Sequence, residues 1–248
     1  TFAITGTVRD YADEGAVPDA RVVLRTEAKE IVGFVKSLAD RGTKVMVWCD
    51  DAYFGLDYEE DIEKQSLFAY LADLSENVLV AKIDGPTKED FAWGFRCGFI
   101  SFACKGMSEA QYDALVRKLM GAIRSSVSCA STVPQTLLLR AFQNPEFENQ
   151  KAAYRKVLEG RYRKVRAFVD AHRSAELEAL PFNSGYFMAF HTKTVDAEVL
   201  RQKLLKERGI GTIAIDAHTL RVAFSSLEED QIDTVYTAIY EESAALAK

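Results

Sequence analysis

The sequence predicts an α/β protein, with a mostly parallel, helix-covered sheet followed by a small C-terminal α+β domain. Helical stretches with one apolar side alternate with short apolar runs in the first part of the chain, an order typical of parallel sheets covered by helices. A long, charge-rich helical pattern over Glu146–Arg173 then leads into the remaining part. We therefore expect two domains, formed by residues 1–147 and 148–248.

The elements expected in the first domain follow from periodicity. The helix over Ala28–Asp40 has its apolar positions at helical spacing and Gly42 after its end. Phe95–Ala103 follows the preceding strand too closely for a helical crossover, so an antiparallel return is expected. The other elements predicted here are strands at Arg21–Leu24, Lys44–Cys49 and Asn77–Ile83, a helix at Glu60–Ser75, and mainly helix from Ser108 to about Ala175.

The second domain is expected to open with the long helix, whose apolar side comprises Ala153, Tyr154, Val157, Leu158, Tyr162, Val165 and Phe168. A strand at Tyr186–His191, a helix at Asp196–Arg208, two short strands and a closing helix from Glu228 complete a compact α+β unit.

Composition excludes several classes of function. The 248 residues are enough to bury a core, and a net charge of −6 argues against a nucleic-acid-binding surface. No apolar run approaches the roughly 20 residues that span a bilayer, and the N-terminus lacks a signal pattern. The four cysteines have no CxxC spacing, which indicates free thiols, and the histidines have no metal-like spacing. We expect a cytoplasmic protein that binds no metal, membrane or nucleic acid.

Polar side chains with distinct chemistry follow two of the predicted strands. Asp50 and Tyr53 come after the first, Thr87 and Lys88 after the second, and Arg96 shortly afterwards. In open α/β sheets, ligands bind just beyond the carboxyl ends of parallel strands, so these groups are expected in one crevice. An amine for a Schiff base, an acid for a pyridine nitrogen and a guanidinium for a phosphate suit pyridoxal 5′-phosphate (PLP).

The same residues carry a resemblance to a known family. Asp50 and Tyr53 have the spacing of an Asp-x-x-Tyr motif, and Thr-Lys-Glu-Asp-Phe-Ala-Trp-Gly-Phe-Arg-Cys-Gly places Arg96 eight residues after Lys88. Asn183–Phe187 and Leu220–Ser225 add two C-terminal motifs. Together, in this order, they resemble the class I/II aminotransferases of PLP fold type I, similar to aspartate aminotransferase, over roughly Thr26 to the C-terminus.

The resemblance implies a role for each residue. Lys88 would form the covalent Schiff base with PLP and move a proton at the substrate, while Asp50 would keep the pyridine nitrogen protonated. Tyr53 would hydrogen-bond the ring oxygen. Arg96 and Thr87 would bind the phosphate, and Arg221 the substrate carboxylate. The implied reaction is transfer of an amino group from an amino acid to a 2-oxo acid, in a homodimer.

The chain also departs from the family pattern. It is much shorter than such enzymes, so the large domain is expected to be incomplete, without the small-residue phosphate loop and the aromatic residue that stacks on the ring. An Asn-Pro-x-Gly segment is absent after Arg21–Leu24, and our hypothesis is that residues are missing between Leu24 and Arg25, the alternative being a genuine deletion. Gly85 stands where the family often has a serine.

Other interpretations of these residues remain open. Alone, Lys88 is typical of a solvated loop, Asp50-Asp51 of a strand end or helix cap, and Arg221 of a structural ion pair. Asp51 is given no cofactor role. The alternative functions are a PLP-dependent C–S lyase on the same scaffold, or a non-catalytic domain that binds PLP or an effector.

Overall fold

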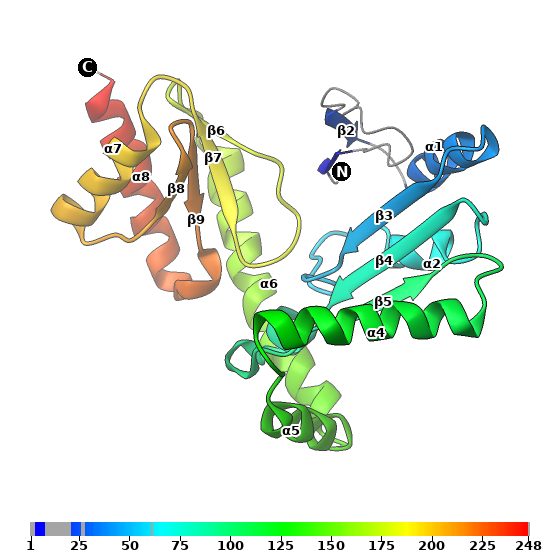
Figure 1. Ribbon diagram of the computed structural model, residues 1–248. Coiled ribbons are helices and arrows are strands. Elements are labelled where there is room, and N and C mark those ends of the chain that lie inside the picture. The colour runs from blue at the N-terminus through cyan, green and yellow to red at the C-terminus, as the bar shows by residue number, and fades with distance from the viewer. Residues whose placement is uncertain (1–2, 8–20, 26–27, 61, 248) are drawn as a thin grey trace. The chain divides into compact units, whose positions relative to one another are not determined.

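The computed structural model describes residues 3–7, 21–25, 28–60 and 62–247 (Figure 1). The chain divides into two compact units. Unit 1 comprises residues 1–55 and 60–147, and unit 2 comprises residues 56–59 and 148–248. The short segment Leu56–Glu59 therefore belongs to the second unit, although it lies within the range that the sequence analysis assigned to the first domain. Each unit is described by itself.

The main sheet of unit 1 has three strands, β3 (Val45–Asp50), β4 (Val78–Asp84) and β5 (Phe99–Ala103), in that order. β3 and β4 are parallel, with Val45 opposite Val78, whereas β5 pairs with β4 antiparallel. The parallel pair and the antiparallel return are both confirmed. β1 (Ala3–Thr7) and β2 (Arg21–Arg25) form a separate antiparallel pair, and the strand expected at Arg21–Leu24 is confirmed. The helix start expected near Thr26 lies outside the described residues.

Two helices cover one face of the three-stranded sheet. α1 (Ala28–Asp40) has the predicted bounds, and Gly42 adopts a φ of +85° just after its end, where a residue with a Cβ would be strained. The core beneath α1 and α2 (Leu67–Leu71) is built from alternate residues of the strands, because successive strand side chains point to opposite faces. Its buried members are Val35, Ala39, Cys49, Leu71, Val78 and Val80.

The prediction of a helix over Glu60–Ser75 is wrong, since among the described residues of that range only the five of α2 are helical. Side chains before it bond to the nearby backbone instead. Glu63 accepts a hydrogen bond from the Gln65 N–H at 2.9 Å, and Ser66 accepts one from the Phe68 N–H at 3.2 Å. Such local bonds compete with helical hydrogen bonds, and Ser66 therefore acts as the N-cap that starts the helix late.

The rest of unit 1 is mainly helical, as predicted. A short helix α3 (Pro86–Glu89) and the turn η1 (Trp93–Phe95) lie between β4 and β5. α4 (Glu109–Ser126) and α5 (Thr132–Phe142) follow, and a capping box formed by Ser108 and Gln111 starts α4. None of the residues of α4, all of which are described, is buried.

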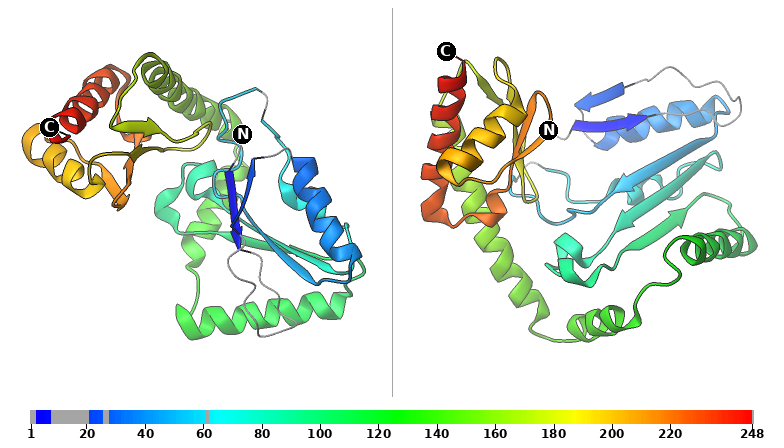
Figure 2. Two further views of the ribbon diagram at one scale, coloured as in Figure 1. Left: turned by 90° about the horizontal axis from the view of Figure 1, so that it is seen from above. Right: turned by 60° about the vertical axis from the view of Figure 1, so that its left-hand side comes forward.

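Unit 2 begins, apart from its short segment, with α6 (Phe147–Ala171), close to the predicted bounds. Its sheet contains four strands in the order β6-β7-β9-β8, all antiparallel. In both views of Figure 2 the closing helix α8, coloured red, runs beside this sheet. The elements are β6 (Leu177–Ala179), β7 (Met188–Thr192), α7 (Ala197–Lys203), η2 (Leu204–Arg208), β8 (Ile213–Asp216), β9 (Thr219–Val222), η3 (Phe224–Ser226), η4 (Glu229–Gln231) and α8 (Ile232–Leu246).

Aromatic side chains fill the core of unit 2. Phe190 of β7 contacts Tyr236 and Tyr240 of α8, and Phe168 of α6 contacts the same two rings. The apolar side predicted for the long helix is therefore buried in its C-terminal half, from Leu158 onward. Its N-terminal members, Tyr154 and Val157, are exposed.

None of the described helices combines the length needed to cross a membrane with enough apolar character.

Candidate functional site

The two adjacent aspartates at the end of β3 have different surroundings. The carboxylate of Asp51 accepts a hydrogen bond from Ser66 Oγ at 2.5 Å, which ties the strand end to the cap of α2. Asp50 is exposed, and its carboxylate accepts only the Ala52 N–H, at 3.2 Å, among the contacts within the described residues. Asp51 thus has a structural role, which agrees with leaving it out of the cofactor site, and Asp50 keeps acceptor capacity for a ligand.

Tyr53 and Lys88 lie together in unit 1. The backbone turns directly after β3, where the Phe54 N–H donates to the Asp51 carbonyl at 2.9 Å, and this turn carries Tyr53. Lys88 lies on α3, just after β4, and its Nζ is 5.0 Å from the centre of the Tyr53 ring. A cation at this distance from a ring face is attracted by it. The amine and the phenol that follow neighbouring parallel strands therefore meet.

The loop that carries Lys88 is in close backbone contact with the loop that carries Arg96. A Cβ added to Gly85 would lie 2.9 Å from the Gly98 Cα and 3.1 Å from the Cys97 carbonyl oxygen. Thr87 Oγ1 donates a hydrogen bond to the same Cys97 oxygen at 3.4 Å. This close approach explains why glycine stands at position 85, because a serine there would force the two loops apart.

Arg96 is held in an unusual backbone conformation. Its φ is +54°, in the left-handed region that non-glycine residues rarely adopt, and Phe91 nearby has a φ of +56°. The exposed guanidinium of Arg96 donates to the Trp93 carbonyl oxygen at 2.9 Å. Strained residues of this kind cluster at ligand sites, and two of them flank the turn between Lys88 and β5.

The charged groups beneath these loops form a small cluster on β3 and β4. Lys82 Nζ bonds the Asp84 carboxylate and lies 5.3 Å from the centre of the Phe54 ring. Burial, together with the nearby charge of Asp51, raises the pKa of the Cys49 thiol to about 11, so this thiol stays protonated at neutral pH. Cys49 therefore contributes to packing and is not a nucleophile.

Arg221 lies in unit 2, on β9, where it pairs with Ala189 of β7 and Ile213 of β8. Its side chain is half-buried, and the guanidinium carbon is 4.5 Å from the centre of the Phe187 ring. Within the described part of the chain, no carboxylate lies at ion-pair distance from Arg221. The expectation of a structural ion pair is therefore not met there, and an arginine held by an aromatic ring retains its donors for a ligand anion.

The site residues predicted from the sequence thus fall into two groups. Asp50, Tyr53, Thr87 and Lys88 lie in unit 1, at or just after the ends of β3 and β4, and Arg96 lies in the same unit between η1 and β5. Arg221 lies in unit 2. The unit 1 set supplies a carboxylate, a phenol, an amine and a guanidinium, which are the groups that PLP requires for its ring nitrogen, ring oxygen, aldehyde and phosphate. The residues present therefore fit that cofactor.

The family model described as aminotransferase class I and II matches residues 22–239 of the chain. The chain belongs to this family. A comparison with curated protein sequences finds no match. Solved structures of aminotransferases, however, share the fold. The chain is 22% identical to an aminotransferase from Anaerococcus prevotii and covers 52% of it, with 89% of this chain aligned and a TM-score of 0.72.

Two further aminotransferase structures give the same result. A kynurenine aminotransferase from Pyrococcus horikoshii has a TM-score of 0.71 at 18% identity, over 88% of this chain and 52% of its own. An α-aminoadipate aminotransferase from Thermus thermophilus, complexed with N-(5′-phosphopyridoxyl)-L-leucine, has a TM-score of 0.63 at 18% identity, over 88% of this chain and 54% of its own. The chain spans about half the length of these relatives. At such identities the likeness establishes the α/β fold of aminotransferases and not a substrate.

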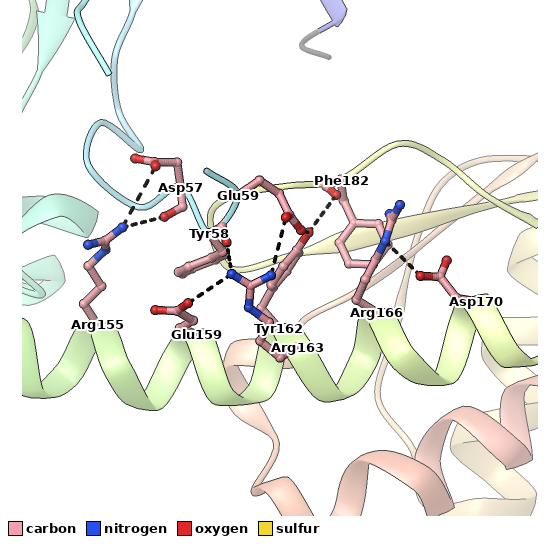
Figure 3. A network of polar contacts seen from close by, with 10 residues as sticks. All are labelled: Asp57, Tyr58, Glu59, Arg155, Glu159, Tyr162, Arg163, Arg166, Asp170 and Phe182. Atoms are coloured by element: carbon pink, nitrogen blue, oxygen red, sulfur yellow. Dashed lines mark hydrogen bonds and ion pairs between the residues drawn. The ribbon is translucent and has the colours of Figure 1, made fainter. Parts of the chain in front are cut away.

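Sequence reasoning missed a set of residues that the structure brings together in unit 2. The segment Leu56–Glu59 follows Tyr53 closely in sequence and packs on α6 through Tyr58, Arg155, Tyr162 and Arg163 (Figure 3). No local motif marks these residues, because their partners lie about a hundred positions away. The sequence offers one signal for this contact, namely that Tyr58 and Tyr162 are aromatic residues within otherwise charged stretches.

Proposed function

We propose that this chain carries the lysine and the carboxylate-binding arginine of a PLP-dependent aminotransferase, which transfers an amino group from an amino acid to a 2-oxo acid. The observation that carries the proposal is the Lys88–Tyr53 pair, with Nζ 5.0 Å from the ring centre, beside Asp50 at the end of the neighbouring strand. Membership of the aminotransferase family supports it.

PLP, when bound, supplies an electron-accepting ring that stabilises negative charge on the substrate Cα. The protein residues do the rest. Lys88 would hold the cofactor aldehyde until the substrate amine takes its place, and its freed amine would then move a proton at the substrate Cα, as a general base must be able to do. Asp50 keeps the ring nitrogen protonated, and Tyr53 donates to the ring oxygen.

Anion binding is the role proposed for three further residues. Arg96 binds the cofactor phosphate with its planar fork, and Arg221 binds the α-carboxylate of the substrate, which orients the Cα–H bond. Thr87 is retained as a phosphate ligand through its hydroxyl, which is also within reach of the Cys97 carbonyl oxygen at 3.4 Å. We further propose a homodimer, for which light scattering should give about twice the monomer mass.

The decisive experiment is borohydride reduction after incubation with PLP, followed by peptide mapping. Wild-type protein should gain one phosphopyridoxyl group on the peptide that contains Lys88, and Lys88→Ala should gain none. Lys82→Ala is the matched control, because Lys82 is a neighbouring lysine that is paired with Asp84, and it should label as wild type does. Labelling at another lysine, or no labelling of wild type, would overturn the assignment.

The products then distinguish the reaction from its alternatives. A transaminase should form more than one equivalent of 2-oxo acid per cofactor from an amino acid only when a second 2-oxo acid is added as acceptor. Release of a 2-oxo acid with ammonia, without an added acceptor, would indicate a lyase. Labelling at Lys88 without turnover of any amino acid would indicate a binding domain.

A further inference from the structure

The segment Leu56–Glu59, called the strap below, is fixed firmly to α6 (Figure 3). Arg155 donates to the Asp57 carbonyl oxygen at 2.7 Å, and Arg163 donates to the Tyr58 carbonyl oxygen and pairs with Glu59. The hydroxyl of Tyr162 donates to the Glu59 carboxylate, which lowers the pKa of that carboxyl below its usual value. The strap therefore has a defined position within unit 2, set by one face of the long helix.

From that position the strap holds the loop Asn183–Tyr186. The Gly185 N–H donates to the Leu56 carbonyl oxygen at 2.8 Å, and the Tyr58 N–H donates to the Asn183 carbonyl oxygen at 3.0 Å. The Tyr58 hydroxyl adds a third bond, to the Gly185 carbonyl oxygen at 2.9 Å. Tyr58 is only 3% exposed and its ring centre is 4.9 Å from that of Tyr162, so this side chain is itself held in place.

The loop in turn leads to the arginine proposed to bind the substrate. Phe187 follows Gly185 by two residues, and its ring faces the guanidinium of Arg221 at 4.5 Å. On the other side, the Ser225 N–H donates to the Tyr186 carbonyl oxygen at 3.2 Å, four residues after Arg221. The loop is thus fixed between the strap and the chain that follows Arg221, and the Phe187 ring limits where the guanidinium can lie.

We propose that Tyr58 is a positioning residue for Arg221, because its hydroxyl fixes the Gly185 carbonyl and with it the Phe187 ring. This inference rests on the proposed function for its consequence, which is that the guanidinium is held ready for the substrate carboxylate. Arg221 lacks a carboxylate partner among the described residues, so the aromatic contact is what orders a flexible side chain before the ligand binds. Such preorganisation increases affinity by reducing the entropy lost on binding.

The first test needs neither substrate nor cofactor. Tyr58→Phe removes only the hydroxyl, and the rate at which phenylglyoxal modifies Arg221 is followed by peptide mass spectrometry. We expect Arg221 to react about five- to tenfold faster than in wild type, the change equivalent to one hydrogen bond. Arg140, on α5 in unit 1, provides an internal reference in the same samples.

The second test uses the loaded protein. With whichever of L-alanine, L-aspartate or L-phenylalanine wild type uses best, Tyr58→Phe should raise KM about five- to tenfold and leave the yield of the Lys88 adduct unchanged. Tyr236→Phe is the matched control. It removes a buried hydroxyl of unit 2 that has no hydrogen-bond partner among the described residues, and it should change neither readout.

The outcomes separate the two proposals. If wild type forms no Lys88 adduct, the proposed function fails, and the phenylglyoxal rate still tests the positioning role. If Tyr58→Phe lowers Tm but leaves the Arg221 rate at the wild-type value, the strap is only structural and the inference is wrong. Should Tyr58→Phe not fold, Phe187→Leu, which keeps an apolar side chain but removes the ring, must accelerate Arg221 modification, and a wild-type rate there would also refute it.

Discussion

The three-stranded sheet of unit 1 and the four-stranded sheet of unit 2 each bury one face, and the buried residues of the core against that face are small or aliphatic in unit 1 but include aromatic rings in unit 2. In unit 2, the residues Met188, Phe190, Leu220 and Val222 of β7 and β9 are each no more than 2% exposed. In unit 1, Val78 and Val80 of β4 are equally buried, and on the other face of the sheet Trp48, Ile83 and Ile100 are 56%, 38% and 39% exposed. The strand register places Ile83 opposite both Asp50 and Ile100, so these exposed residues share one face of the sheet.

The unit with the more extensive aromatic core is therefore not the unit that carries most of the candidate site residues. Unit 2 has a closed aromatic core and positions a single candidate ligand-binding side chain, Arg221. Unit 1 has a core whose buried residues are small or aliphatic, and it carries the lysine, the aspartate and the tyrosine at its strand ends. Ligand-binding segments are commonly drawn from the less stable parts of a protein, because few buried contacts hold them. We therefore expect the two units to unfold separately, unit 1 at the lower temperature.

The largest expected effect comes from the core of unit 2. Phe190→Ala should destabilise unit 2 by about 3–5 kcal/mol, because it leaves a cavity between β7 and α8. The matched control is Phe99→Ala in unit 1, where the same change affects a ring on β5 that is half exposed, and the loss should be much smaller. Differential scanning calorimetry should show only the upper transition moving in Phe190→Ala. A single transition that shifts as a whole would contradict the division into independent units.

The pH dependence of unit 2 gives a smaller effect. Glu242 on α8 is buried beside Arg208 Nε at 2.7 Å and Lys203 Nζ at 3.3 Å. The hydrogen bond from Arg208, followed by that from Lys203, lowers the pKa of this carboxyl below its usual value of 4.5. Because the folded pKa is lower than the unfolded one, the contribution to stability is complete above about pH 4.5 and is lost as the pH falls through the folded pKa.

Glu242→Gln should therefore lower the melting temperature of unit 2 at pH 7 and flatten its decline below pH 4.5, with the unit 1 transition unchanged. Thermal melts at a series of pH values test this. Glu241→Gln is the control, since the neighbouring carboxylate is exposed and pairs with Arg208 through Nη2, at 3.0 Å. Equal effects of the two substitutions would mean that burial at position 242 does not matter.

Two glycines, Gly33 inside α1 and Gly42 just after its end, test unit 1 by changes of about 1 kcal/mol in its free energy of unfolding. Gly42→Ala should destabilise unit 1 by about that amount, because φ is +85° there although no atom would contact the new Cβ. Gly33→Ala lies inside the helix in equally open space and should stabilise it by about 0.5–1 kcal/mol. The pair differs only in backbone conformation. Calorimetry on the lower transition should show opposite shifts, and shifts of one sign would contradict the assigned turn.

Local patterns predicted much of the fold. The bounds of α1, the parallel β3–β4 pair, the antiparallel β5 and the long α6 follow from periodicity, capping and the length of connections. The helix expected at Glu60–Ser75 did not form, because Glu63 and Ser66 bond to the local backbone, and this competition is not visible in apolar spacing. The three-residue strand β6 is too short to carry a pattern of its own.

For the candidate site, the sequence could supply residue types and order but not their neighbours. Motif spacing predicts Asp50, Lys88 and Arg221 as site residues, and the structure separates Asp50 from Asp51 by the hydrogen bond that Ser66 donates to Asp51. Motif spacing could not predict that the Phe187 ring contacts Arg221 or that the Tyr58 hydroxyl bonds the Gly185 carbonyl oxygen. Each contact joins segments that are distant in sequence, and tertiary packing alone decides which aromatic ring meets which cation.

The smallest expected effect tests the open face of unit 1 directly. Trp48→Gln should change the stability of unit 1 by less than about 0.5 kcal/mol, since the indole is more than half exposed and exposed substitutions usually have effects of this size. A loss of several kcal/mol would mean that the face is covered in solution, as a buried indole would be. Repeating the melts at two protein concentrations then identifies the cover, because stabilisation by a second copy increases with concentration and intramolecular packing does not. If stability increases with protein concentration, this face of the sheet is exposed only in the isolated chain, and the proposed homodimer would cover the sheet that carries Asp50.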